Sequence, residues 1–316
     1  MDSIGGYFEL ELKNLGFVFH DNAIAVNSGR NALEYILLLK KYKKLYLPYY
    51  TCDVTLQPIK KLNLNYEFYY LDNDFLPILK KIKDNEALLF VNYFGLMNNN
   101  IKYLKYKYKN LIIDNAQAFY SNPVDEVLTF YSPRKFFGLP DGGFVYSNTK
   151  RKLILEIDKS SNRISHLINR IEDGAEAGYK FFQQNDNKLN NLPLRRMSKL
   201  TDKLLRNIDF EAVRRKRNEN FEILHIKLKN DNELTPIIEK TIVNGPMVYP
   251  FLAKGNVKLR DKLISEKIFV PKYWPNVIKW LGDKKYWENY LFENLIALPI
   301  DQRYYYKEMN KILKII

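Results

Sequence analysis

Short apolar runs alternate with segments of helical periodicity along the first half of the chain. An apolar run of about 4–8 residues between polar turns is typical of a buried strand. Such runs occupy residues 23–27, 45–50, 66–71, 87–93, 111–114 and 127–131. Helical patterns stand between them, at 32–41, at 103–108 and in the stretch that ends at Lys60. This alternation predicts an α/β layer built on a mainly parallel sheet.

The second half of the chain has a different pattern. Apolar positions at helical spacing predict helices, and two short apolar runs predict strands. The helices are 152–171, 198–224, 258–266 and 304–314, and the strands are 247–251 and 268–270. The polar stretch 174–191 is interpreted as a loop or as a helix with a mobile end. We therefore expect a large α/β domain over residues 1–200 and a smaller α+β domain over residues 201–316.

Three polar residues, Ser28, Asp114 and Lys135, stand at or just beyond the carboxyl ends of predicted strands. Ligands bind beyond these ends in parallel sheets, so we expect the three residues to converge on one crevice. Ser28 also begins a helix, where free backbone N–H groups can hold a phosphate. The same serine could simply cap the helix, and the local pattern leaves both interpretations open.

The stretch Thr129–Gly143 places Lys135 in a polar turn after a strand, beside Arg134 and before the paired glycines. An amine at the rim of a sheet can reach a cofactor, and it must be partly neutral to attack a carbonyl. Burial near another cation lowers the pKa of a lysine amine, and Arg134 could supply part of that effect. Taken alone, the pattern also fits a solvated surface lysine, and most lysines that follow a strand are of that kind.

The chain of 316 residues is 46% hydrophobic and 27% charged, and it carries a formal net charge of +14. A strongly basic chain can bind nucleic acid, because lysine and arginine neutralise phosphates. The lysines are spread along the chain, however, and no known nucleic-acid-binding motif accompanies them. A lysine-rich solvated surface is the simpler interpretation. A basic active-site mouth that attracts an anionic, phosphate-bearing substrate is compatible with it.

The chain has one cysteine, Cys52, and its three histidines lie far apart in sequence. Neither an intramolecular disulfide nor a zinc site of cysteine and histidine is therefore expected. No apolar run approaches the roughly 20 residues of a membrane span, and the first residues lack the pattern of a signal peptide. We expect a cytoplasmic protein that has no metal and binds neither membrane nor nucleic acid. The first segment, 4–12, is expected to lie over the body of the protein.

Four segments together resemble the DegT/DnrJ/EryC1/StrS sugar aminotransferases, which are pyridoxal-phosphate enzymes of the aspartate aminotransferase fold type I. They are NSGRNAL at 27–33, LPYYTC at 47–52, DNAQA at 114–118, and SPRK with its paired glycines at 132–143. Weaker similarities follow in RRMS at 195–198, PKYWP at 271–275 and ALPI at 297–300. The resemblance spans nearly the whole chain. It implies a mainly parallel seven-stranded sheet with helices on both faces, a small C-terminal α+β domain, and a homodimer with active sites at the interface.

The resemblance also implies roles for individual residues. Lys135 would hold pyridoxal 5'-phosphate as a Schiff base and shuttle a proton during the reaction. Asp114 would pair with the pyridine nitrogen and keep it protonated. Gln117 would contact the ring hydroxyl. The phosphate would be held by Ser28, Gly29 and Arg30, and also by Ser132, whose hydroxyl could instead stabilise a turn.

The sequence departs from the family pattern at several positions. Arg30 stands where a threonine is usual, and it could grip the phosphate or point elsewhere. Cys52 replaces an aromatic residue that stacks on the pyridine ring, so Tyr50 is a candidate for that stack. Leu194 replaces an asparagine that reaches the phosphate of the neighbouring subunit. Residues that could line the substrate pocket, or serve packing and surface charge instead, are Arg195, Arg196, Tyr273 and Trp274.

The function that the resemblance implies is transfer of an amino group from an amino acid, expected to be glutamate, to a nucleotide-linked keto-sugar. The product would serve the synthesis of sugars for surface polysaccharides or glycans. An alternative is a pyridoxal-phosphate enzyme of the same fold that acts on a non-sugar ketone or catalyses another reaction. The family's sugar dehydratases carry histidine at the position of Lys135, and the lysine argues against that branch. A basic nucleic-acid-binding protein without enzymatic activity is a minor alternative.

Overall fold

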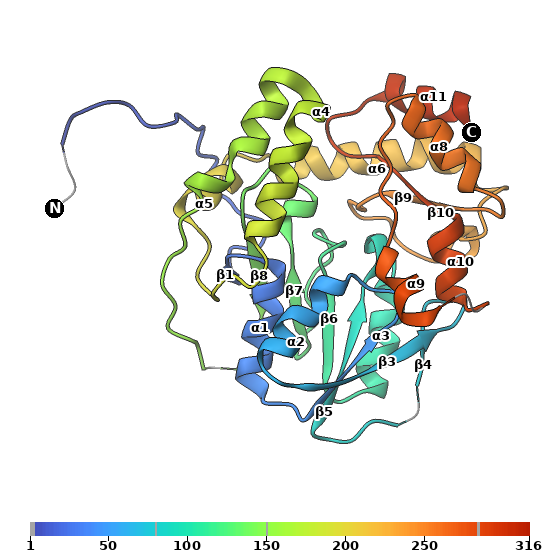
Figure 1. Ribbon diagram of the computed structural model, residues 1–316, viewed down its shortest axis with the longest axis horizontal. Coiled ribbons are helices and arrows are strands. Elements are labelled where there is room, and N and C mark those ends of the chain that lie inside the picture. Colours follow the sequence, from blue (N-terminus) through green and yellow to red (C-terminus); the bar gives the residue numbers. More distant parts are fainter. Residues whose placement is uncertain (1–3, 80, 150, 283–284) are drawn as a thin grey trace.

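A computed structural model describes residues 4–79, 81–149, 151–282 and 285–316. In this part of the chain, eight strands form one large sheet in the order β1-β8-β7-β6-β5-β2-β3-β4 (Figure 1). The strands are β1 Ile24–Val26, β2 Lys44–Pro48, β3 Asn65–Leu71, β4 Pro77–Ile78, β5 Glu86–Val91, β6 Leu111–Asn115, β7 Leu128–Tyr131 and β8 Gly143–Tyr146. The run β7-β6-β5-β2-β3 is parallel, and β8, β1 and β4 join through antiparallel pairs.

Helices cover both faces of this sheet, as the alternating pattern predicts. Figure 1 shows α1 and α2 in front of the sheet and α3 behind it. The helices are α1 Gly29–Lys40, α2 Leu56–Lys61, α3 Asn98–Lys107, α4 Ser165–Lys188, α5 Lys199–Leu205, α6 Phe210–Leu228, α7 Thr235–Glu239, α8 Val257–Ser265, α9 Pro275–Leu281, α10 Trp287–Asn294 and α11 Tyr306–Ile315. The mainly parallel α/β fold is confirmed, and the sheet has one strand more than the seven predicted because the two-residue β4 extends its edge.

The centre of the sheet is buried on both faces. Every residue of β5 and of β6 is buried, including Glu86 and Asp114. A strand that is covered on both sides needs apolar side chains in both directions, which explains the continuous runs ALLFV and LII. Glu86 accepts a hydrogen bond from the hydroxyl of Tyr46 at 3.1 Å. Asp114 stands at the opposite end of its strand, where the sheet meets the cavity described below.

The C-terminal part of the chain is built around a second, two-stranded antiparallel sheet of β9 Tyr249–Leu252 and β10 Leu295–Leu298. Both strands are fully buried. Helix α6 contacts β9 and α11, and α8 also contacts α11. Figure 1 shows these helices above the large sheet, on the side of the carboxyl ends of its parallel strands. The division of the chain at residue 200 stays a prediction.

Several predicted elements differ from the structure for local reasons. The helix predicted over 152–171 begins only at Ser165, because 156–158 runs beside Arg196 as extended chain. After a break at Gly174, α4 resumes and runs to Lys188, so most of the polar stretch 174–191, for which a loop or a helix with a mobile end was expected, is helical. The long helix predicted over 198–224 is two helices: α5 ends at Leu205, and α6 begins after Asp209, whose Oδ1 accepts a hydrogen bond of 2.9 Å from Ala212 N. No strand forms at 268–270 among the described residues.

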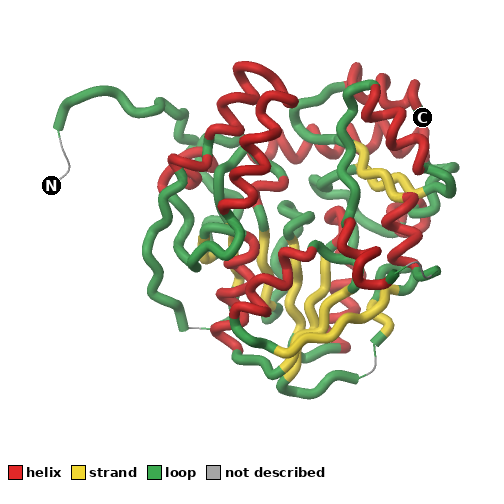
Figure 2. The backbone as a smooth tube through the Cα atoms, in the orientation of Figure 1, coloured by secondary structure: helices red, strands yellow, loops and turns green. Residues whose placement is uncertain are grey.

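The N-terminal segment differs most from its prediction. Residues 4–17 are almost all exposed, and Figure 2 shows the N-terminal segment leading away from the body of the molecule. It contacts the body at Glu9, which pairs with Lys203, and at Leu15, whose N–H donates to Arg206 O at 2.8 Å. The side chains of Ile4, Tyr7 and Phe8 are more than 90% exposed. The expectation that 4–12 lies over the body was therefore wrong. Over the described ranges, no helix combines the length and the apolar character that a membrane crossing requires.

Candidate active site

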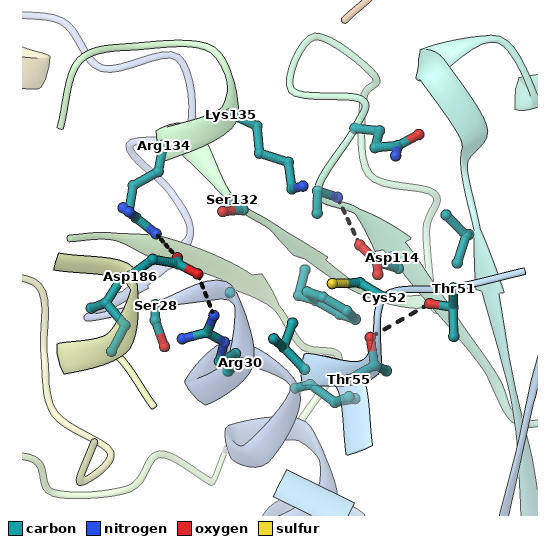
Figure 3. A pocket seen from close by; sticks show the side chains of 18 of the residues that line it. Ser28, Arg30, Thr51, Cys52, Thr55, Asp114, Ser132, Arg134, Lys135 and Asp186 are labelled. Carbon is teal, nitrogen blue, oxygen red and sulfur yellow. Dashed lines mark hydrogen bonds and ion pairs between the residues drawn. The ribbon is translucent and has the colours of Figure 1, made fainter. Parts of the chain in front are cut away.

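A cavity of about 230 Å³ opens beyond the carboxyl ends of the parallel strands. Chain segments from different strand ends line it: 28–30 after β1, Thr51 and Cys52 after β2, Asp114 at the end of β6, and 132–135 after β7. This is the crevice in which ligands bind in open α/β sheets. The structure thus brings Ser28, Asp114 and Lys135 to one cavity (Figure 3).

Asp114 lies at the inner end of the cavity and is 8% exposed. Its Oδ1 accepts a hydrogen bond of 2.8 Å from the backbone N–H of Ala116, which fixes the carboxyl group. Burial raises the pKa of Asp114 to about 6, against the opposing effects of that hydrogen bond and of the Lys135 charge. A carboxylate in this setting is strongly stabilised by any protonated group that enters the cavity beside it.

Lys135 ends a short turn, Pro133–Lys135, that directly follows β7. Proline at the start fixes the backbone of the turn, and Phe136 N–H closes it on Pro133 O at 2.9 Å. The carbonyl oxygen of Phe136 accepts from Gln302 Nε2 at 2.9 Å and from Arg217 Nη2 at 3.3 Å. Figure 3 shows the lysine side chain reaching into the cavity on the side of Asp114. The Phe136–Phe137 peptide, one residue beyond the lysine, is therefore held by two side chains of the C-terminal part of the chain.

Gln117 is 2% exposed and also lines the cavity. Its Oε1 accepts a hydrogen bond of 2.9 Å from the backbone N–H of Phe94, so the orientation of the amide is set. Its Nε2 is buried and has no hydrogen-bond partner among the described residues. A buried N–H group without a partner is costly, so this amide is suited to donate to an acceptor on a bound molecule.

The N-terminus of α1 forms the other end of the cavity. Ser28 Oγ accepts from Asn31 N at 3.1 Å, so the serine caps the helix. Gly29 lies so close to Ser132 that an added Cβ would stand 3.1 Å from Ser132 Cβ. Both residues line the cavity, and the missing side chain leaves the start of α1 open to it. A helix N-terminus with a bare backbone and a nearby hydroxyl is a favourable site for an anion.

Two arginines stand at this end and share one carboxylate. Arg30 Nη2 and Arg134 Nη1 each lie 3.4 Å from an oxygen of Asp186 on α4. Figure 3 shows Arg134 turned toward Asp186 and away from the amine of Lys135. Burial lowers the pKa of Arg134, an effect that Asp186 opposes and that repulsion by Arg30 reinforces.

Other residues singled out in the sequence take different places. Tyr50 is fully buried behind the cavity, where its ring packs against Tyr93 and Trp274, and it is not among the lining residues. The stack proposed for Tyr50 therefore lacks the necessary geometry. Cys52 lines the cavity instead, and burial raises the pKa of its thiol, which keeps it neutral near pH 7.

The four candidate substrate residues do not all reach the cavity. Trp274 lines it. Tyr273 stacks on Phe94 outside the lining, with ring centroids 6.4 Å apart. Arg195 lies 3.6 Å from Asp158, and the exposed Arg196 forms a backbone bridge with Val26. In this chain, Tyr273, Arg195 and Arg196 are thus separate from the cavity.

Sequence reasoning missed the contribution of α4. Phe182, Asp186 and Leu189 line the cavity, and their spacing of four and then three residues places them on one face of a helix. The helical spacing of these three residues was present in the sequence, but the polar residues of 183–188 obscured it. In the described part of the chain, no group of three histidine, cysteine or acidic residues is arranged to hold a metal ion.

No family model matches the chain, and no curated protein is similar to it in sequence. Solved structures nevertheless match nearly its full length, and the fold that they define is that of the pyridoxal-phosphate-dependent sugar aminotransferases. Spr1654 of Streptococcus pneumoniae, assigned as a sugar aminotransferase and solved in its PLP form, superposes with a TM-score of 0.64 at 14% identity. The match covers 92% of this chain and 85% of that one.

Two further structures show the range of chemistry on this fold. A DegT DnrJ EryC1 StrS aminotransferase from Brucella abortus has a TM-score of 0.61 at 16% identity, over 94% of this chain and 85% of its own. The GDP-4-keto-6-deoxymannose-3-dehydratase ColD, with bound GDP-perosamine, has a TM-score of 0.63 at 15% identity, over 93% and 87%. Because both transferases and a dehydratase share the fold, the residues of the site must decide the reaction.

Proposed function

We propose that this protein is a pyridoxal-phosphate-dependent aminotransferase that moves an amino group from an amino acid to a nucleotide-linked keto-sugar. The observation that carries the proposal is the set of unpaired or reactive groups around one cavity. Lys135 offers an amine, Asp114 a buried carboxylate, and Gln117 an N–H donor that no described residue pairs with. At the far end, the start of α1 and two arginines offer a phosphate site.

These residues fit the cofactor at each of its polar groups. Asp114 would hold a proton on the pyridine nitrogen, Gln117 would donate to the ring hydroxyl, and Ser132 with Gly29 would meet the phosphate. A charge-assisted hydrogen bond such as that of Asp114 contributes about 1.5–3 kcal/mol. The bound cofactor supplies an electron sink for the carbon that loses its proton. Lys135 Nζ would bind the cofactor covalently and, when released, carry the proton from one carbon to the other.

The choice of an amino transfer over a dehydration rests on Lys135. A lysine amine can both hold the cofactor and return a proton to the carbon that receives the new amino group. The similarity to ColD gives the dehydration as the competing reaction on this fold. Glutamate is the proposed donor, and the product sugar is proposed to enter surface polysaccharides or glycans. The excess of positive charge at the cavity suits the phosphates of a nucleotide sugar.

A single-turnover measurement tests the proposal. Protein loaded with pyridoxal phosphate should convert about one equivalent of glutamate per chain to 2-oxoglutarate, and a nucleotide-linked keto-sugar should then sustain turnover. Lys135→Ala should lower the rate by about 10²–10⁴-fold, since proton transfer by a positioned side chain contributes on that scale. Lys102→Ala, at an exposed position of α3, is the matched control and should keep the full rate.

Three outcomes would count against the proposal. Lys135→Ala could retain the wild-type rate. Glutamate could leave the loaded protein unchanged. The sugar could lose a hydroxyl without gaining an amine, which would assign the chain to the dehydration reaction.

The proposal includes a homodimer. Helix α4 carries apolar side chains that this single chain leaves exposed, among them Ile168 at 50% and Ile171 at 82%. The N-terminal segment adds Ile4, Tyr7 and Phe8. Exposed apolar groups that are this numerous support association with another copy. Sedimentation velocity measures the number of copies directly.

A further inference from the structure

Arg30 and Arg134 reach the same point of the cavity from different elements. Arg30 belongs to the first turn of α1, and Arg134 belongs to the turn that carries Lys135. Their guanidinium groups are both bridged by the carboxylate of Asp186, at 3.4 Å on each side. Two cations against one anion leave an excess of one positive charge, before the amine of Lys135 is counted.

Besides the nitrogen that contacts Asp186, each arginine has a buried nitrogen without a partner among the described residues. Arg30 Nη1 and Arg134 Nε are inaccessible to solvent and have no hydrogen-bond partner among the described residues. The arginine side chains are 12% and 15% exposed, whereas that of Asp186 is 44% exposed. Buried guanidinium donors without a partner indicate a missing acceptor. Phosphate is the acceptor for which paired arginines are best shaped.

Asp186 is held in place from both sides along α4. Asn185, which is 2% exposed, donates from Nδ2 to Pro140 O at 3.1 Å. Leu189 is 1% exposed and closes the helix with a hydrogen bond from its N–H to Asn185 O at 3.1 Å. The end of α4 that carries Asp186 is therefore anchored, and the carboxylate lies between both guanidinium groups.

We propose that Arg30 and Arg134, positioned by Asp186, form a clamp within one chain for a phosphate dianion. Under the proposed function, on which this inference rests, the dianion is the phosphate of pyridoxal phosphate. Arg30 Nη1 and Arg134 Nε donate to it, next to the start of α1. The diphosphate of a nucleotide sugar has the same chemistry, and the experiment separates the two sources.

The test measures binding in a Lys135→Ala background, where no covalent link contributes. The probes are pyridoxal phosphate, pyridoxal, which lacks the phosphate, and UDP. Arg30→Gln and Arg134→Gln should each weaken binding of pyridoxal phosphate by about 10–100-fold, the size expected for a charged hydrogen bond. Pyridoxal binding should change by less than about threefold, which also shows that each variant is folded. Arg195→Gln, at an arginine outside the cavity, is the matched control and should change neither affinity.

Asp186 is a positioning residue, and its variants give a separate readout. Asp186→Asn should reduce the preference for pyridoxal phosphate over pyridoxal by up to about tenfold, because the arginines lose their orientation. Asp186→Glu, which restores the charge, should recover most of that preference. Tighter binding of pyridoxal phosphate by Asp186→Asn would overturn the positioning role.

The clamp is overturned if pyridoxal phosphate and pyridoxal lose affinity equally, or if neither arginine variant weakens pyridoxal phosphate. It is also overturned if the arginine variants weaken UDP alone, since the phosphate would then belong to the nucleotide. Failure of the proposed function would be seen in a different experiment. With Lys135 present, borohydride would then trap no cofactor on the chain. The non-covalent affinities would still decide the clamp in that case.

Discussion

At the scale of single residues, the site depends on groups whose environment sets their charge. Asp114 is the clearest case, because burial at the end of β6 raises the pKa of its carboxyl to about 6. The carboxylate therefore ionises close to neutral pH and gains most from a cation placed against it. Gln117 complements it with an amide that is oriented by Phe94 and whose Nε2 has no partner in the part of the chain that the structure describes.

The pKa of Asp114 predicts a pH dependence of cofactor affinity. Below about pH 6 the carboxyl group is protonated and cannot hold a pyridinium proton, and above it the carboxylate can. We therefore compare the affinity of the wild type for pyridoxal phosphate with that of Asp114→Asn, as a ratio. From pH 5 this ratio should rise by up to about tenfold per pH unit. Above pH 6 it should level off at a value of about 10–100. Taking the ratio cancels the titration of the phosphate itself, which also falls near pH 6. Titrations from pH 5 to 8 that give a constant ratio would contradict this role for Asp114.

Sequence reasoning reached part of this site and not the rest. Ser28, Asp114 and Lys135 were predictable because each stands at or just beyond the end of a strand, whereas Gln117 and Ser132 came from the resemblance to the sugar aminotransferases. Asp186 was not, because its role depends on how α4 packs over the cavity. The position of Tyr50 was not predictable either. The chain turns after β2, so that Cys52, which stands two residues after Tyr50, lines the cavity and Tyr50 does not.

At the scale of elements, the start of α1 is fixed by the approach of β8. Strand β1 pairs with β8, and Gly142 N donates to Asn27 O at 3.0 Å, just before the helix begins. A Cβ on Gly143 would stand 2.4 Å from Ser28 O. Glycine is required there because the backbone of β8 lies directly against the residue that caps α1.

Gly143→Ala should therefore destabilise the fold strongly. A Cβ cannot fit beside a backbone oxygen without moving β8 or α1, and overpacking of this kind costs about 1–3 kcal/mol or more. Gly138→Ala, in the loop that precedes β8, is the matched control, since its Cβ meets only the end of the Leu167 side chain at 3.3 Å. Urea unfolding should show the free energy of unfolding lowered for Gly143→Ala and little changed for Gly138→Ala. Equal stability of both variants would contradict the close approach.

The elements themselves were predicted unevenly. The parallel strands have continuous apolar runs, and their order along the chain was readable from that pattern. The bounds of helix α4 could not be predicted in the same way, because residues 183–188 are polar and Gly174 interrupts the helix with a positive φ of 88°. The break between α5 and α6 lies before Asp209, which caps α6 from inside one apolar periodicity.

At the scale of the whole molecule, Arg217 joins the C-terminal elements to the turn of Lys135. It is 1% exposed on α6, and its guanidinium donates to the carbonyl oxygens of Pro246, Met247 and Phe136. The same group lies 4.6 Å from the centroid of the Phe136 ring. The C-terminal part of the chain thus holds the Phe136–Phe137 peptide, one residue beyond Lys135. Long-range contacts of this kind leave no local signal in the sequence.

The central claim is that Lys135 carries the cofactor, and reductive trapping tests it most directly. Wild-type protein is incubated with pyridoxal phosphate, reduced with borohydride, digested with trypsin and analysed by mass spectrometry. Trypsin cuts after Arg134 but not after a modified lysine, so the account predicts one adduct, on the peptide 135–150. An adduct spread over surface lysines, or none on that peptide, would contradict the account.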